Sequence, residues 1–234
     1  MTTILRDAQA ALDEGKYELV LALTAPLATS APELTAKQKA SLHSLRAQSC
    51  FRLDRFPEAA KERALEIVCL EASSSDPAFV ESIRYALAWA LYQSSSFQAA
   101  LENAARVYLF REANLGASDP KTLLALTLCV DALDKLGNGP ASLSLAEELH
   151  ERRLNSPGAT DVEIRGASMR LERARAASVT GALPIVVDNP RIDVIARPNP
   201  ALAASTGRVA EILYAVTSGT ARGAVRGLIE GLLG

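Results

Sequence analysis

The fold is decided by a short stretch, FPEAA at residues 56–60, which recurs as FQAA at residues 97–100. Tyr17 leads a comparable run nearer the amino terminus, and the three leading aromatics are 39 and 41 residues apart. The dipeptide Asp-Pro also recurs, at residues 76–77 and 119–120. A period of about forty residues indicates a helical repeat array, in which each unit buries its apolar face by stacking on its neighbours. Such arrays offer extended surfaces, so we expect a binding protein.

The composition agrees with closely packed helices. Of the 234 residues, 49% are hydrophobic but only 5% are aromatic, so alanine and leucine must supply most of the packing. These residues favour helices over sheets. The formal net charge of −2 gives no general attraction to nucleic acid or to an anionic membrane, and we expect no nucleic-acid partner.

Apolar periodicity and the turn residues between the periodic segments predict four helix pairs and one further helix. The predicted class is an all-α, right-handed α-solenoid of about four helix-turn-helix repeats, followed by a capping helix and a C-terminal helical segment. The expected pairs are residues 3–14 with 17–27, 36–53 with 57–71, 78–93 with 97–114, and 120–136 with a helix that follows a turn at 137–140 and ends near 155. A single, more polar helix over 161–178 would cap the stack.

The recurring residues resemble the tetratricopeptide repeat (TPR) family, whose unit has a glycine at the turn, an aromatic two residues on and a small residue three beyond that. Matches to this pattern are Gly15, Tyr17 and the terminating Pro32 in the first unit, Phe56 and Ala59 in the second, and Phe97 and Ala100 in the third. Asp54 and Ser95 stand in the place of the glycine, and Val20 replaces the small residue. The linker at 111–120 resembles the kinesin-light-chain variety, whose period is longer. The resemblance covers about residues 1–179.

The resemblance implies that a ligand lies in a concave groove lined by the first helix of each pair. Projected onto this chain, the groove residues are Gln48, Phe51 and Arg52, then Ser82, Tyr85, Trp89, Tyr92 and Gln93, then Thr127, Asp131, Asp134 and Lys135. Aromatic side chains with a polar tip are enriched at the energetic centres of interfaces, so Trp89 is the first candidate for a partner contact. Alternatively, Tyr85 and Trp89 fill the seam between adjacent pairs. Only Arg52 and Lys135 are basic here, so we do not expect the family's carboxylate clamp.

The carboxy-terminal part has a different composition. Residues 180–200 are rich in proline and predict an extended connector. Residues 201–234 predict an amphipathic helical segment, with Gly219, Gly223, Gly227 and Gly231 at every fourth position beside Val225, Leu228, Ile229 and Leu232. Glycines at this spacing favour close approach of another helix.

Three readings of this segment stay open. It docks on a helical partner, which includes a second copy of the chain (a homo-oligomer) or its own groove; it contacts a membrane surface; or it only caps the array. The low excess of basic residues favours protein docking over a membrane.

Signals for chemistry are few. His43 and His150 lie in different units without metal-ligand spacing, so packing or surface roles are expected. Cys50, Cys69 and Cys129 lie in apolar helical patterns and predict buried, reduced thiols, and no secretory signal or transmembrane run is evident, so we expect a cytoplasmic protein. Glu147-Glu148 predicts a solvated face.

We therefore expect a non-enzymatic adaptor or scaffold, without cofactor or metal, that binds a peptide or helix of a protein partner. One alternative is an assembly or membrane-tethering factor that acts through residues 201–234, and a more distant one is a chaperone of a secreted protein.

Overall fold

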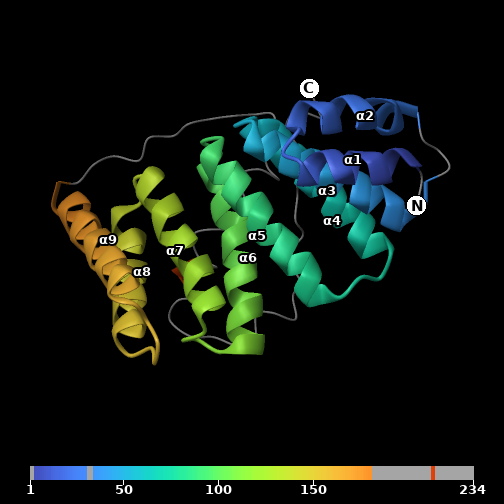
Figure 1. The fold of residues 1–234 in the computed structure, drawn as a ribbon. Helices are drawn as coiled ribbons and strands as arrows, with labels where there is room; N and C mark the ends of the chain where they lie inside the picture. The colour runs from blue at the N-terminus through green and yellow to red at the C-terminus, as the bar shows by residue number, and fades with distance from the viewer. Residues whose placement is uncertain (1–2, 31–33, 181–211, 214–234) are drawn as a thin grey trace, which may run out of the picture. The chain divides into compact units, whose positions relative to one another are not determined.

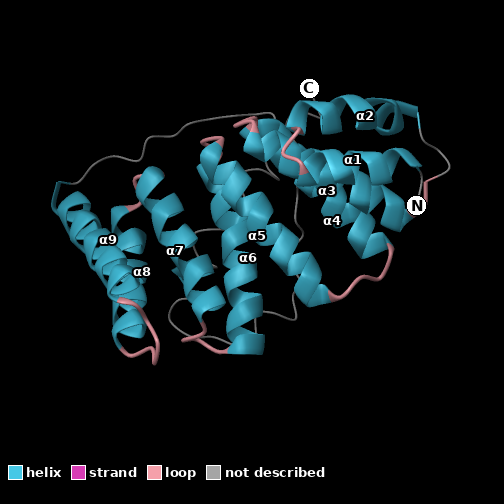
Figure 2. Cartoon of the chain, viewed as in Figure 1, coloured by secondary structure: helices cyan, strands magenta, loops and turns pink. Residues whose placement is uncertain are grey.

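The computed structural model describes residues 3–30, 34–180 and 212–213 (Figure 1). These residues fall into two compact units: unit 1 includes those up to Asn103, and unit 2 those from Ala104 onward. Throughout the described part the chain is helical between turns and short loops, without a strand (Figure 2). The boundary between the units lies inside the helix Phe97–Leu115.

The helices come as consecutive antiparallel pairs followed by one more helix. Their bounds are α1 Thr3–Asp13, α2 Tyr17–Ser30, α3 Ala36–Arg52, α4 Phe56–Ala72, α5 Pro77–Gln93, α6 Phe97–Leu115, α7 Pro120–Lys135, α8 Gly139–Leu154 and α9 Asp161–Thr180. The predicted ends agree with these bounds to within three residues in most cases.

Each pair turns on one residue with a left-handed backbone. These residues are Gly15, Asp54, Ser95 and Gly137, with φ of 73°, 56°, 62° and 68°. In the first turn the Gly15 amide donates to the carbonyl of Leu12, and the Lys16 amide donates to the carbonyl of Ala11, both at 2.9 Å. The other three turns repeat this pattern, which is the Schellman motif that ends helices. The glycine position of the repeat is therefore a conformational requirement, met at two turns by other residues.

Helix starts follow from capping residues. The Asp76 carboxylate accepts a hydrogen bond from the Ala78 amide at 3.3 Å, and the Asp119 carboxylate accepts one from the Lys121 amide at 2.8 Å. In both helices a proline follows at the first position, where its missing N–H costs nothing. The two Asp-Pro dipeptides therefore begin α5 and α7, as the sequence predicts.

Unit 1 has a core built largely from alanine and leucine. One buried cluster joins α1, α2 and α3 through residues such as Leu5, Val20 and Leu42. A second joins α3, α4 and α5 to the first turn of α6, where Ala100 is fully buried. Small residues at such positions let helices approach closely, which accounts for the recurring alanine three residues after the leading aromatic.

Unit 2 packs α7, α8 and α9 against one another, as Figure 1 shows. Its fully buried side chains include Tyr108 of α6, Leu126 of α7 and Leu149 of α8. At the start of α8, a Cβ added to Gly139 would lie 3.5 Å from the backbone of Ser178 in α9. The start of α8 therefore lies in close contact with the end of α9.

Two local predictions are wrong. Helix α2 does not end near Pro26 or Leu27, where an end was predicted, but continues to Ser30. A proline inside a helix removes one hydrogen bond, and here the packing of α2 on α1 and α3 outweighs that loss. The fourth turn is also shorter than expected, because Gly139 and Pro140 belong to the first turn of α8, with Asn138 as its cap.

Candidate functional site

The predicted contact residues of α5 form a partly exposed aromatic stripe in unit 1. The rings of Trp89 and Tyr92 stack with centroids 5.7 Å apart and planes 13° from parallel. Tyr92 also meets the edge of Phe97 at 5.5 Å and packs on the buried cluster of unit 1. Trp89 keeps 37% of its surface exposed. A rigid indole is thus presented to solvent on a ring that is itself fixed by the core.

The other α5 positions flank this stack. Ser82 and Gln93 are exposed, and Tyr85 is half-buried. The Ser82 hydroxyl donates to the backbone carbonyl of Phe79 at 2.6 Å. Trp89 is therefore accessible to solvent, whereas Tyr85 is only partly accessible. That this stripe contacts a partner stays a prediction.

The α3 residues lie in the same unit. Gln48 and Arg52 are exposed, while Phe51 is half-buried and packs on the same buried cluster as Tyr92. Phe51 and Phe56 form an edge-to-face contact across the α3–α4 turn, with ring centroids 5.3 Å apart. Tyr92 and Phe97 form the same kind of contact across the α5–α6 turn. The second and third repeats therefore carry equivalent aromatic pairs at their turns.

The α7 residues of unit 2 are placed differently. Asp131 accepts a two-pronged contact from Arg170, at 2.9 and 2.8 Å, and a further hydrogen bond from Arg173 at 3.1 Å. Arg173 also pairs with Asp134 at 2.8 Å. Both carboxylates are engaged by α9. Thr127, half-buried, donates to the carbonyl of Leu123, and Lys135 remains exposed.

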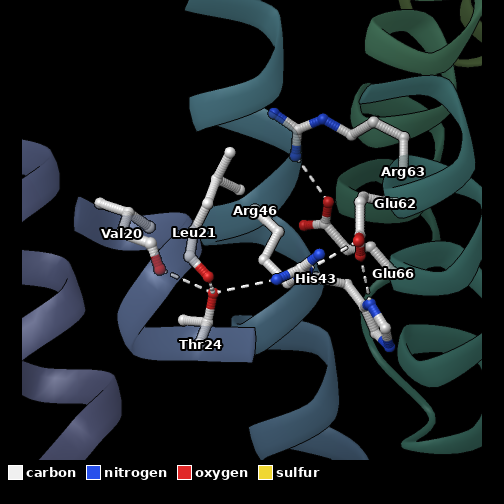
Figure 3. Close-up of polar contacts among 8 residues, drawn as sticks. All are labelled: Val20, Leu21, Thr24, His43, Arg46, Glu62, Arg63 and Glu66. Carbon is white, nitrogen blue, oxygen red and sulfur yellow. Dashed lines mark hydrogen bonds and ion pairs between the residues drawn. The ribbon is translucent and has the colours of Figure 1, made fainter. Parts of the chain in front are cut away.

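A polar network links α2, α3 and α4, and the sequence analysis missed it (Figure 3). The Glu62 carboxylate of α4 lies 2.7 Å from Nδ1 of His43 and 2.7 Å from Nε of Arg46, both on α3. Arg46 also donates to the Thr24 hydroxyl of α2 at 3.2 Å. Burial alone would raise the pKa of Glu62, but the hydrogen bonds from His43 and Arg46 outweigh it and lower the pKa. His43, for which a packing or surface role was expected, is a hydrogen-bond partner of Glu62 in this network.

Beside it, Arg63 pairs with Glu66 at 2.6 Å. Only the one-turn spacing within α4 could have revealed this pair from the sequence. No comparable spacing in the sequence indicates the contacts between α2, α3 and α4, because the residues that meet there lie far apart along the chain.

A second unpredicted network centres on Arg152 of α8. Its guanidinium donates to the Tyr108 hydroxyl and to Glu112, both at 2.9 Å, and to Glu148 at 2.6 Å. Tyr108 is fully buried and donates to Glu112. Burial raises the pKa of this tyrosine, and its bond to Glu112 adds to that. The prediction of a solvated Glu147-Glu148 face is therefore wrong for Glu148 and fits only Glu147, which is exposed.

The cysteines are free thiols of low reactivity. Cys50 and Cys129 are buried and Cys69 is half-buried. Burial raises the pKa of all three. In the described ranges no three metal-ligating side chains converge, and none of the helices there combines the length and apolarity that a bilayer crossing requires.

The remaining predictions concern residues outside the described ranges. They are Pro32, residues 181–200 of the predicted connector, and the four glycines and four apolar residues of 201–234. Thr180, the first residue of that predicted connector, is instead the last residue of α9. Within that last segment only Ile212 and Leu213 are described, and Leu213 is buried in unit 2.

Comparison with known proteins supports the fold only. No family model matches the sequence, and no curated protein matches it. Among solved structures, the crystal structure of BtubC (BKLC) from P. vanneervenii is similar, with a TM-score of 0.52 and 17% identity over 82% of this chain and 84% of that one. This likeness shows an all-α solenoid with a TPR-like repeat fold.

Proposed function

We propose that this protein is a non-enzymatic adaptor or scaffold that binds a peptide or a helical segment of a partner protein on the α3–α5 face of unit 1. TPR-like folds serve as protein-interaction scaffolds in general. The turn residues, which lie 39, 41 and 42 positions apart, further favour the longer-period variety of the repeat. The alternatives that depend on residues 201–234 have no comparable support in the described residues.

One observation supports this proposal above the others: a half-exposed indole stacked on a ring that the core holds in place. Trp89 needs no rearrangement before it meets a ligand, because Tyr92 and Phe97 already restrict it. Less side-chain entropy is then lost on binding. Exposed Gln48, Arg52 and Gln93 would supply the polar contacts that surround such an anchor.

The test uses peptides selected from a random phage-displayed library against the purified full chain. Because Trp89 is the chain's single tryptophan, its emission reports directly on whether a selected peptide covers it. We expect a blue shift on binding. For variants, affinity is measured by the anisotropy of a dye-labelled peptide. Trp89→Ala should raise Kd at least about fivefold, which corresponds to about 1 kcal/mol, while far-UV circular dichroism stays unchanged.

A matched control is available in the same unit. Leu65 of α4 is 39% exposed, almost the same fraction as Trp89. Leu65→Ala should therefore leave peptide affinity unchanged. The proposal fails if the selected peptides bind Trp89→Ala as tightly as the unaltered chain, or if this substitution unfolds unit 1 and so shows the indole to be a core residue.

A further inference from the structure

The outward face of α9 is an apolar stripe that the described part of the chain leaves uncovered. Val162 and Met169 are 70% and 69% exposed, more than any other large hydrophobic side chain described. Ala176 is also exposed. The three residues are spaced by seven, close to two helical turns, so they lie on one side of the helix. Terminal repeats usually present a polar face to water, and here two large apolar side chains interrupt the charged residues of that face.

The rotation of α9 about its axis is fixed, so the stripe cannot turn inward. Ala167, Leu171 and Ala174 are buried on the opposite side. Arg170 is held by Asp131 of α7, as described above, and Glu163 accepts a hydrogen bond from Arg153 of α8 at 2.9 Å. These contacts anchor both halves of the helix with Met169 facing outward.

Two opposite charges flank the stripe on one side. Arg165 and Glu172 are both exposed, and neither forms an ion pair within the residues described. Arg165 donates only to the backbone carbonyl of Asp161, at 3.3 Å. The other flank carries Arg173, neutralised by the α7 carboxylates, and Gly166, which has no side chain.

We propose that a second copy of this chain covers the stripe, with the two α9 helices antiparallel about a two-fold axis at Met169. Arg165 lies four residues before Met169 and Glu172 three after it, on the same flank. In an antiparallel pair, Arg165 of each copy therefore faces Glu172 of the other, which gives two ion pairs.

The remaining positions agree with this symmetry. Val162 and Ala176 lie seven residues on either side of Met169, so a large apolar residue meets a small one at each end. Arg173 lies four residues after Met169 and Gly166 three before it, so each Arg173 meets an empty position instead of another cation. One helix pair is smaller than a standard interface, so we expect a weak dimer that dissociates on dilution.

The apolar part is tested by sedimentation equilibrium of the full chain over a range of concentrations. The unaltered protein should show a monomer–dimer equilibrium, and Met169→Asp should be monomeric throughout. Val68→Asp is the matched control, since Val68 is 62% exposed on α4 of unit 1, and it should dimerise like the unaltered chain. Circular dichroism checks that each variant is folded.

The charges give a sharper test. R165E and E172R should each weaken dimerisation at least tenfold, because each places like charges opposite one another twice. Mixing the two variants should restore association as a heterodimer, and the double variant R165E/E172R should dimerise again. The proposal is overturned if the unaltered chain stays monomeric at every concentration, if dimers survive Met169→Asp and so form elsewhere, such as through residues 201–234, or if mixing restores nothing.

Discussion

Replacing Asp131 by asparagine should destabilise the protein by about 2 kcal/mol, because this carboxylate holds α9 in place. The side chain of Asp131 is 12% exposed, and the two arginines that it binds are 29% and 52% exposed. A charge-assisted hydrogen bond with a buried partner contributes roughly 1.5–3 kcal/mol, and the half-exposed Arg173 contact far less, roughly 0.5 kcal/mol. Asparagine retains one acceptor but turns an amide toward the guanidinium donors.

The expected cost stays below the roughly 3–5 kcal/mol of breaking a fully buried ion pair. After the substitution, Arg170 and Arg173 can still turn toward water, so no charge is left buried without a counterion. Urea unfolding followed by circular dichroism measures the loss of stability. Amide hydrogen exchange should show that the protection lost is concentrated in α9, which is the helix that the arginines belong to.

Asp134→Asn is the control. The side chain of Asp134 is 17% exposed, and its ion-pair partner within the described ranges is the half-exposed Arg173, so we expect a loss of at most about 0.5–1 kcal/mol. The reasoning is refuted if Asp131→Asn unfolds within about 0.5 kcal/mol of the unaltered chain. If stability is unchanged but selected peptides no longer bind, Asp131 is instead the partner contact that the sequence analysis predicts.

Three further predictions follow from the networks and turns. Arg152→Ala should lower the free energy of unfolding by about 3 kcal/mol, because it leaves a buried hydroxyl and two carboxylates without their cation. The side chain of Arg175 is 60% exposed, so Arg175→Ala should change the free energy of unfolding by less than about 0.5 kcal/mol. Urea titrations compare the two variants. Gly15→Ala should cost about 1 kcal/mol and Ser95→Gly should stabilise by up to about 1 kcal/mol, since both positions have positive φ; opposite shifts in thermal midpoint check this, and shifts of equal sign contradict it. The folded-state pKa of Glu62 is lowered, so the stability that this carboxylate contributes is present above its ordinary pKa of 4.5 and is lost as the pH falls through the lower folded value. The difference in unfolding free energy between the unaltered chain and Glu62→Gln should therefore shrink below about pH 4.5.

The elements of the fold were predictable because their signals are local. The Asp-Pro starts of α5 and α7 and the aromatic–alanine spacing are readable within a few residues, and the turns recur because each needs one left-handed residue. Pro26 is the instructive exception, since a strong local breaker is overruled by contacts with other helices. Local preference decides an element only where packing does not oppose it.

The polar networks were not predictable, because their members meet only after the helices stack. His43 and Glu62 are 19 residues apart, and Tyr108 and Arg152 are 44 apart. In each pair, the residues next to one partner in the sequence do not indicate where the other partner lies. The helix over 161–178 was predicted as a more polar cap, but nothing in the sequence indicated that Arg170 and Arg173 bind carboxylates of α7.

This difference changes where unit 2 can meet a partner. A groove prediction assumes that the first helix of each pair keeps its inner face free, but α9 occupies the carboxylates of α7 that would have lined it. The same contacts fix the rotation of α9 and direct Val162 and Met169 outward. Among the large hydrophobic side chains described in this unit, Val162 and Met169 of α9 are the most exposed, ahead of Leu154 of α8 and Leu124 of α7. If Asp131→Asn loosens α9 as expected, it should also weaken dimerisation, although Asp131 lies outside the proposed contact. A dimer of unchanged affinity in this variant would show that the anchoring of α9 by Asp131 and the dimer contact are independent.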